Sequence, residues 1–375
     1  MGNAGLSGTH KVARPDNQCM EIQMTDVDHG KVEEFAGKVV GDVAGAMALL
    51  MAYIGDQSGV YAAMDGAGPL SPEDLAAQTG MNARYLREWL SANAAAGYVE
   101  YDPASAKFNL TPEQATVLSR EGQPDCVQGF IQAVISQFET HERAAEIFRS
   151  GEGRPWSDQS PCCFCATDRF FRPGYEANLV ENWIPSLDGV HEKLKAGGKI
   201  ADIACGHGSS TVLMAQTYPN AKIVGIDFHP PSIEAARKKA KEAGVDNVEF
   251  VVATAQDFEG ANFDFACIFD ALHDMGDPVG AARHIKQALK PNGTFMLVEP
   301  LAGDTLAENM NPIGQIFYSF STTVCVPASL SQDIGYGLGA QAGEARLTKV
   351  LNEGGFTHVR RAAETHTNMV LEVRA

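Results

Sequence analysis

The segment Ile268–Pro278, IFDALHDMGDP, places a histidine among three carboxylates directly after an apolar run. That run, Phe263–Phe269, has the length and composition of a short buried strand. His273 can take up a proton near neutral pH, and a neighbouring acid such as Asp274 can orient its ring. Two interpretations are open from these residues alone: a solvated turn, or a catalytic base beside a bound ligand.

The elements that must position this segment are strands alternating with helices, beginning at residue 199. Helices such as residues 230–244 and 279–289 separate apolar strands predicted at 199–205, 221–227, 248–253, 263–269 and 293–300. The alternation predicts an α/β fold, a Rossmann-like, doubly wound parallel sheet with helices on both faces, ended by an antiparallel closing hairpin. Such sheets bind ligands at the carboxyl edge of their strands, where residues 268–278 emerge.

Composition limits the classes of function. The chain has 375 residues, 45% hydrophobic and 20% charged, which indicates a globular protein with more than one domain. Its formal net charge of -18 argues against nucleic-acid and membrane partners, because both attract basic surfaces. No run approaches the roughly 18 uninterrupted apolar residues of a membrane helix, and no apolar signal region is present. With eight scattered cysteines, these features predict a cytoplasmic protein.

The N-terminal part is expected to be mainly helical. Residues 1–27 are polar and aperiodic and predict a flexible tail, whereas residues 32–53 predict a long apolar helix. Ser71 and Asn82 are suitable N-caps for two further helices, and a short hairpin should follow them. Residues 28–115 therefore predict a winged-helix domain, and residues 116–185 a helical linker with a cysteine-bearing break near Pro161.

A glycine turn and a helix follow the first strand in IADIACGHGSSTVLMA, residues 200–215. Gly206 and Gly208 let the backbone bend tightly and approach a ligand, while the helix start offers unpaired N–H groups. A dinucleotide site would have a third glycine where Thr211 stands, so that fingerprint fails. Asp227 ends the second strand about 20 residues later, where a carboxylate can hold two ribose hydroxyls.

With these residues, the chain from about residue 199 resembles the class I S-adenosylmethionine-dependent methyltransferases. The resemblance implies that residues 186–375 form the cofactor-binding methyltransferase domain. It departs from the family pattern at Ala204, Ser210 and Thr254, where the family usually has two glycines and an acid. The implied cofactor-binding residues are Asp202, Gly206, Gly208, Asp227, Phe228, Ala255, Gln256, Asp257 and Phe269.

The segment LHDMGDP resembles the His-Asp-Trp region of small-molecule O-methyltransferases, with Met275 in place of the tryptophan. The resemblance implies that His273 is the general base for methyl transfer, oriented by Asp274 or by Glu299 from LVEP. Two alternatives remain: His273 caps the helix that follows, or it only positions a soft nucleophile such as a thiol. Asp270 and Asp277 are interpreted as turn and cap residues.

The winged helix suggests DNA binding, yet residues 51–115 hold three basic and eight acidic residues, a net charge of -5. The whole chain resembles bacterial two-domain methyltransferases that use such a domain for dimerisation. The resemblance, together with the apolar helix, implies a homodimer acting on a small molecule. A winged-helix regulator with a ligand-sensing methyltransferase-like domain is the alternative.

The same resemblance places the substrate cavity between the linker and the segment after the fifth strand. It implies substrate contacts from Asn309, Asn311, Phe317, Tyr318 and Cys325. The linker also carries Cys162, Cys163 and Cys165, which suit either plain packing or a soft acceptor such as a metalloid or thiol. No metal site is predicted, because zinc would need a second ligand pair at matching spacing.

Overall fold

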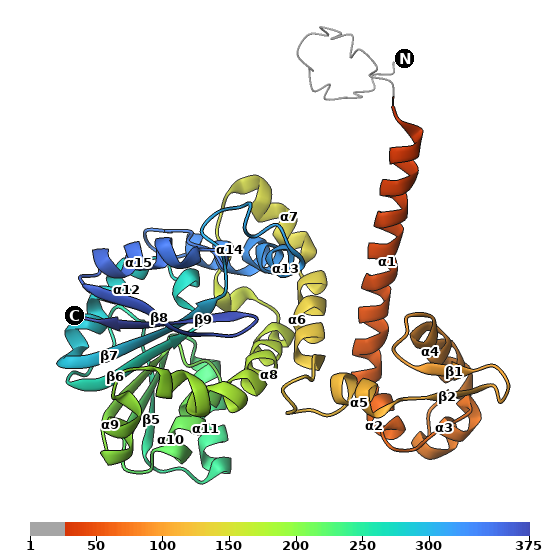
Figure 1. Ribbon diagram of the computed structural model, residues 1–375, viewed down its shortest axis with the longest axis horizontal. Helices are drawn as coiled ribbons and strands as arrows, with labels where there is room; N and C mark the ends of the chain where they lie inside the picture. Colours follow the sequence, from red (N-terminus) through yellow and green to blue (C-terminus); the bar gives the residue numbers. More distant parts are fainter. Residues whose placement is uncertain (1–26) are drawn as a thin grey trace, which may run out of the picture. The chain divides into compact units, whose positions relative to one another are not determined.

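The structure is a computed structural model that describes residues 27–375 (Figure 1). The predicted tail, residues 1–27, therefore lies outside the described residues except for Val27. The chain divides into two units, residues 1–47 and 48–375, and helix α1 (His29–Ser58) belongs to both. By length and composition this helix is apolar enough to cross a membrane, whereas no such segment was predicted from the sequence. Near its C-terminal end, Ala52 and Gly55 are buried.

A helix–turn–helix with a small hairpin follows, as predicted. Its elements are α2 (Val60–Met64), α3 (Pro72–Thr79), α4 (Ala83–Ala95), β1 (Glu100–Asp102), β2 (Lys107–Asn109) and α5 (Pro112–Leu118). Ser71 caps α3 in a reciprocal pair with Asp74, and Asn82 caps α4. Tyr61 and Trp89 pack edge to face, 5.0 Å between ring centroids, in the core of this domain.

The linker is helical, with a break that ends just before Pro161, near the predicted position, but the break does not carry the cysteines. The linker comprises α6 (Gln128–Glu139), α7 (His141–Ser150), η1 (Trp156–Asp158), α8 (Pro161–Asn178), η2 (Leu179–Trp183) and η3 (Ile184–Ser186). Ser160 caps α8 and Pro161 occupies its first position, so Cys162, Cys163 and Cys165 lie on the first turns of a helix. Helices α6 and α8 lie side by side (Figure 1). The division at residues 28–115, 116–185 and 186–375 stays a prediction.

The C-terminal part is a seven-stranded sheet with the order β5-β4-β3-β6-β7-β9-β8. The strands from β3 to β7 pair in parallel, whereas β9 and β8 pair antiparallel, as the closing hairpin predicted. The strands are β3 (Lys199–Ile203), β4 (Lys222–Asp227), β5 (Val248–Val252), β6 (Phe263–Phe269), β7 (Leu289–Pro300), β8 (His358–Glu364) and β9 (Asn368–Arg374). The connecting segments are α9 (Val190–Ala196), α10 (Ser209–Thr217), α11 (Pro230–Ala243), η4 (Leu272–Asp274), α12 (Pro278–Ala288), α13 (Pro312–Phe320), η5 (Ser321–Cys325), α14 (Val326–Leu330) and α15 (Gly343–Glu353).

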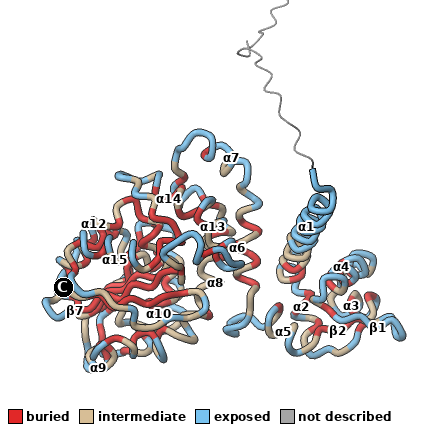
Figure 2. The backbone as a smooth tube through the Cα atoms, turned by 45° about the horizontal axis from the view of Figure 1, so that its top comes forward, coloured by how far each residue is buried: buried red, intermediate tan, exposed pale blue. Residues whose placement is uncertain are grey.

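Alternating side chains of the central strands enter two different cores. Ala266 and Ile268 of β6 pack with α12 and α15, whereas Phe265 and Cys267 pack with η2, α9 and α10. Both sides are fully covered, which explains why these strands are apolar throughout (Figure 2). The direction of chain progress reverses at β3, because β4 lies on one side of it and β6 on the other. This switch point opens a crevice at the carboxyl ends of β3, β4 and β6.

Candidate active site

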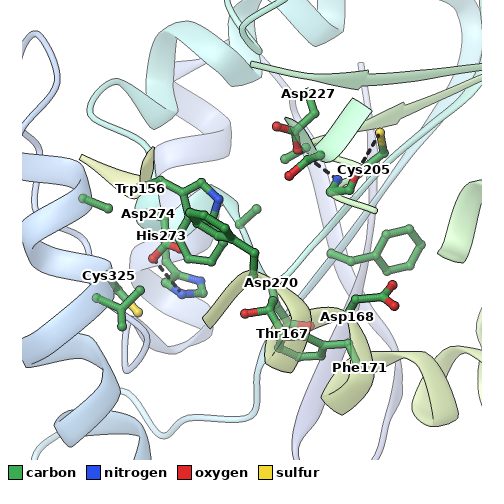
Figure 3. Close-up of a pocket in the computed structure, with 18 of the residues that line it drawn as sticks. Trp156, Thr167, Asp168, Phe171, Cys205, Asp227, Asp270, His273, Asp274 and Cys325 are labelled. Carbon is green, nitrogen blue, oxygen red and sulfur yellow. Dashed lines mark hydrogen bonds and ion pairs between the residues drawn. The ribbon is translucent and has the colours of Figure 1, made fainter. Parts of the chain in front are cut away.

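A cavity of about 390 Å³ occupies this crevice (Figure 3). Three groups of residues line it: the glycine turn after β3, the segments after β4, β5 and β6, and a wall formed by α8, α13 and η5. Among the predicted site residues, those that line the cavity are Gly206, Asp227, Phe228, Ala255, Gln256, Phe269, His273, Asp274, Phe317 and Cys325. Residues from five separate segments of the predicted site therefore meet in one cavity.

The glycine turn has the left-handed backbone that its residues suggested. Gly206 and Gly208 have φ of 52° and 74°, and the N–H of Gly206 donates to Oδ2 of Asp227 at 2.9 Å. Gly208 does not line the cavity. A Cβ at its position would lie 2.8 Å from the Cβ of Ala236, so Gly208 is required for close packing of α11. Its contribution to a ligand site is through the shape of the turn.

Asp227 is buried at the end of β4 and lines the cavity. Burial raises the pKa of its carboxyl, while the backbone N–H groups of His229 and Gly206 partly offset that effect. Both bonds come from the backbone, at 2.8 and 2.9 Å, so the carboxylate has a fixed orientation. Such a carboxylate, with remaining lone pairs toward a cavity, fits the binding of two vicinal hydroxyls.

Asp202 lies beneath the turn and is not among the residues that line the cavity, so its predicted contact with a cofactor stays a prediction. Its Oδ2 accepts hydrogen bonds from the hydroxyls of Ser210 and Thr211 at 2.7 and 2.6 Å. The side chain is fully buried, and burial raises the pKa of Asp202 to about 6. Asp202 therefore holds the first turn of α10 against β3, and it shapes the site from behind.

The segment after β5 reaches the cavity with Ala255 and Gln256 but not with Asp257. Asp257 accepts hydrogen bonds from the N–H and the hydroxyl of Thr254, at 2.8 and 2.6 Å, and so closes a local turn. Phe228 lines the cavity with a 48% exposed side chain, whereas Phe269 is buried within it. These residues offer an amide and two aromatic faces to a ligand.

His273 is buried between two acids and a thiol. Its Nδ1 pairs with Oε2 of Glu299. Its Nε2 lies 3.2 Å from Oδ1 of Asp274, and the ligand atoms of His273, Asp274 and Cys325 lie within 4.8 Å of one another (Figure 3). Burial disfavours the charged imidazole, but Glu299 and Asp274 outweigh it and hold the pKa of His273 well above its usual value. Glu299 itself does not line the cavity. It orients the ring, while its Oε1 accepts the N–H of Leu272 at 2.9 Å.

The segment that carries His273 contains two acids in the predicted local positions, one of which also lines the cavity. Asp277 caps α12 by accepting the N–H of Gly280 at 2.7 Å, as predicted. Asp270 does occupy a turn, with φ of 49°, but it also lines the cavity and accepts from Asn368 at 2.7 Å. Its Oδ2 is buried without a partner among the described residues. A strained, buried carboxylate of this kind is typical of a functional site.

The substrate wall is only partly as predicted. Phe317 and Cys325 line the cavity, whereas Asn309, Asn311 and Tyr318 do not. Asn309 is buried and exchanges hydrogen bonds with the backbone of Gly303, at 2.8 and 3.0 Å. Asn311 caps α13 by accepting the N–H of Gly314 at 2.8 Å. Asn309 therefore satisfies backbone groups of the loop after β7 and Asn311 those of the first turn of α13, and their contact with a substrate stays a prediction.

Helix α8 supplies much of the cavity wall that was predicted for the linker, although of its lining residues only Cys163 was named from the sequence. The residues of α8 that line the cavity are Cys163, Phe164, Thr167, Asp168, Phe170, Phe171 and Tyr175. The spacing of Phe164, Thr167, Phe171 and Tyr175, by three or four residues, was a readable sign of one helical face. Phe130, Trp156 and Phe320 complete an aromatic lining.

The three cysteines of α8 do not form a cluster of ligands. Cys163 is buried and lines the cavity, Cys165 is exposed, and the thiol of Cys162 lies 3.5 Å from the hydroxyl of Tyr53. Within residues 27–375, the one group of three metal-type side chains with converging ligand atoms is His273, Asp274 and Cys325. Among the described residues, the three thiols of α8 therefore do not converge on one site that could bind a soft acceptor.

Two family models match the chain. The model described as Methyltransferase domain matches residues 194–355, and that described as Rv2258c-like winged HTH domain matches residues 45–120. A demethylmenaquinone methyltransferase of Listeria monocytogenes is 26% identical over 179 residues, which cover 45% of this chain and 73% of that protein. The two family models cover the segments that form the crevice and the helix–turn–helix, respectively.

Solved structures match almost the whole chain. The mitomycin 7-O-methyltransferase MmcR superposes with a TM-score of 0.69 at 19% identity, over 92% of this chain and 100% of that one. Human N-acetylserotonin methyltransferase, solved in complex with SAM, gives a TM-score of 0.63 at 17% identity, over 90% and 97%. At these identities the likeness shows the fold: a methyltransferase sheet preceded by a helical winged-helix domain.

Proposed function

We propose that this chain, an S-adenosylmethionine-dependent methyltransferase with an N-terminal winged-helix domain, methylates a hydroxyl group of a small aromatic acceptor, with His273 as the general base. The observation that carries the proposal is the buried Glu299–His273 pair beside the cavity that Gly206 and Asp227 also line. A base, an acid suited to ribose hydroxyls and an aromatic wall then share one cavity.

The residues present fit the cofactor. S-adenosylmethionine, when bound, supplies a methyl group on a sulfonium that a nucleophile can attack. Asp227, held by two backbone N–H groups, would accept from the ribose hydroxyls. Ala255, Gln256 and Phe228 would meet the adenine, and Gly206 lets the backbone approach the ligand closely.

His273 has to lose a proton before it can act as a base. In the free protein Glu299 and Asp274 favour the imidazolium, so the neutral form is gained only as the pH rises. A cation bound in the same cavity opposes that charge and favours the neutral ring. The Nδ1–H then remains on the Glu299 side, and Nε2 takes the acceptor hydroxyl proton as the oxygen attacks, which contributes about 10²–10⁴ in rate.

The nature of the acceptor is inferred from the cavity wall. Phe130, Phe170, Phe171, Phe317 and Phe320 present flat apolar faces, and Phe130 stacks on Phe170 with centroids 4.9 Å apart. Such a wall favours a flat aromatic acceptor over a sugar or a peptide. The names of similar proteins, which act on demethylmenaquinone or at a mitomycin oxygen, support the same choice.

A dimer in the cytoplasm completes the proposal. Val32, Phe35, Val39, Val43 and Met47 are exposed and recur every three or four residues along α1, which gives this helix one apolar stripe. A second copy of α1 would cover that stripe. The cysteines at described positions are free, which fits a reducing compartment.

The test is a screen of phenols, hydroquinones, thiols and amines for release of S-adenosylhomocysteine, followed by His273→Ala and His273→Gln with the best acceptor. We expect both variants to lose about 10²-fold or more in turnover while the cofactor affinity stays unchanged. A glutamine variant with most of the wild-type rate would assign His273 to positioning, and a preference for thiols would reject the hydroxyl acceptor.

A further inference from the structure

Asp168 is an acid that lines the cavity but is neither the predicted base nor the predicted ribose-binding residue. It lies on α8, its side chain is only 16% exposed, and it lines the cavity (Figure 3). Gly206, His207 and Ser209 of the glycine turn line the same cavity. Oδ1 of Asp168 accepts the hydroxyl of Ser209 at 2.6 Å. Helix α8 of the linker thus reaches across to the glycine turn after β3.

The acids that line the cavity divide by position. Asp227 lies at the end of β4, where the ribose is expected, and Asp270 and Asp274 lie on the segment that carries His273. Asp168 is the lining acid that is bonded to the first residue of α10, immediately after the glycine turn. A ligand that extends from Asp227 along this turn therefore ends beside Asp168.

S-adenosylmethionine has a free α-ammonium group at the end opposite its adenine. We propose that Asp168 binds this ammonium group, so that α8 of the linker forms part of the cofactor site. A carboxylate has about four lone-pair sites, and the contacts to Ser209 and Lys239 leave room for another donor. The inference rests on the cofactor and is independent of His273 as the base.

Lys239 makes Asp168 available as an anion. Its Nζ lies 2.8 and 2.9 Å from the two carboxyl oxygens of Asp168, and it does not itself line the cavity. Burial opposes ionisation of Asp168, but Lys239 and Ser209 outweigh burial and keep the pKa of Asp168 below its usual value. Lys239 thus approaches the carboxylate from behind and keeps it charged for a cation on the cavity side.

Helix α8 is held in place independently of Asp168. The next residue, Arg169, donates to Asp56 at 2.6 and 2.9 Å and to Gln128 and Gln132 at 2.8 and 3.1 Å. Substitution of Asp168 should therefore leave the helix in its position. This separates the loss of one ligand contact from a general loosening of the cavity.

The experiment measures dissociation constants by calorimetry for two ligands: S-adenosylhomocysteine, and its analogue that lacks only the amino group. For Asp168→Asn we expect affinity for S-adenosylhomocysteine to fall by roughly ten- to a hundredfold, the usual effect of one charge-assisted hydrogen bond. Affinity for the deaminated analogue should stay within about twofold, because that ligand has no ammonium to lose. The matched control is Glu176→Gln, an exposed acid on the same helix, which should change neither value.

The ratio of the two constants within one variant is insensitive to partial unfolding, because both ligands meet the same folded fraction. Equal weakening of both ligands by Asp168→Asn, or no change in either, would overturn the proposal. Lys239→Met provides a second test: without the cation that keeps Asp168 ionised, the preference for the amino-bearing ligand should weaken at acidic pH and return as the pH rises. A preference that Lys239→Met leaves unchanged at every pH would overturn the role of Lys239. Failure of the wild type to bind S-adenosylhomocysteine would instead count against the cofactor.

Discussion

Replacement of Glu299 by glutamine tests how the site makes a base of His273. Glu299 is 1% exposed, and its two oxygens have different partners. Oε1 accepts the N–H of Leu272 at 2.9 Å, and Oε2 pairs with Nδ1 of His273. Glutamine has the same shape, but one of its two terminal atoms is a donor. Because Leu272 requires the oxygen, the amide nitrogen must face Nδ1.

This exchange reverses the tautomer of His273. A donor opposite Nδ1 requires a lone pair there, so the neutral ring carries its hydrogen on Nε2 and cannot take a proton at that atom. The general-base contribution of about 10²–10⁴ in rate should then be lost, equivalent to about 3–5 kcal/mol at 1.36 kcal/mol per tenfold. The affinity for S-adenosylhomocysteine should stay unchanged, since Glu299 does not line the cavity.

The assay is single-turnover methyl transfer with saturating acceptor, measured across pH. In the wild type the rate should rise with pH, with a midpoint above the usual value for histidine, because Glu299 and Asp274 raise the pKa of His273. In Glu299→Gln the rate should be low and this rise should disappear. Glu353→Gln, on α15 and away from the cavity, is the control and should behave as the wild type.

A Glu299→Gln enzyme that retains a rate within threefold of the wild type, with the same pH profile, would refute the orienting role. A variant that instead loses affinity for S-adenosylhomocysteine would show that Glu299 supports the cofactor site. A melting temperature measured alongside separates either result from unfolding, and the isosteric change should keep it close to that of the wild type.

Three further predictions follow from the packing of the chain. Gly208→Ala should lower the free energy of unfolding by about 2–5 kcal/mol, because Gly208 has a left-handed backbone and packs closely against α11. The control Gly244→Ala, at a position with φ of 68° and open space, should lower it by only about 1–2 kcal/mol, and urea titrations measure both values. Burial raises the pKa of Asp202 from 3.8 to about 6, so the stability that its protonated carboxyl contributes is full below pH 3.8 and is lost as the pH rises through 6, about 3 kcal/mol in all. Asp202→Asn should therefore gain stability relative to the wild type as the pH rises through that window. A difference in stability between the two proteins that does not depend on pH would contradict this. Val39→Asp combined with Val43→Asp should convert a dimer into a monomer in light scattering without loss of the folded signal, and an unchanged mass would exclude the α1 stripe as the interface.

The sequence alone identified the features that depend on neighbours along the chain. The alternation of strands and helices, the glycine turn and the caps Ser71, Asn82 and Asp277 all follow from local periodicity and residue type. Asp227 and His273 were also found this way, because parallel strands bring their carboxyl ends to one edge. Any polar residue just after such a strand is then a candidate for the site.

Tertiary structure decided the direction in which each candidate faces and which distant segments meet it. Asp202 turns inward because the hydroxyls of Ser210 and Thr211 lie over it once α10 packs on β3. Glu299 reaches His273 because β7 pairs with β6 in a register that sets Val298 beside Phe269, so the next residue emerges at the same edge. The wall from α8 depends on how this linker helix docks against a sheet that begins more than 20 residues later in the chain. The spacing of aromatic residues within α8 can indicate an apolar face, but it does not indicate which distant segment that face will contact.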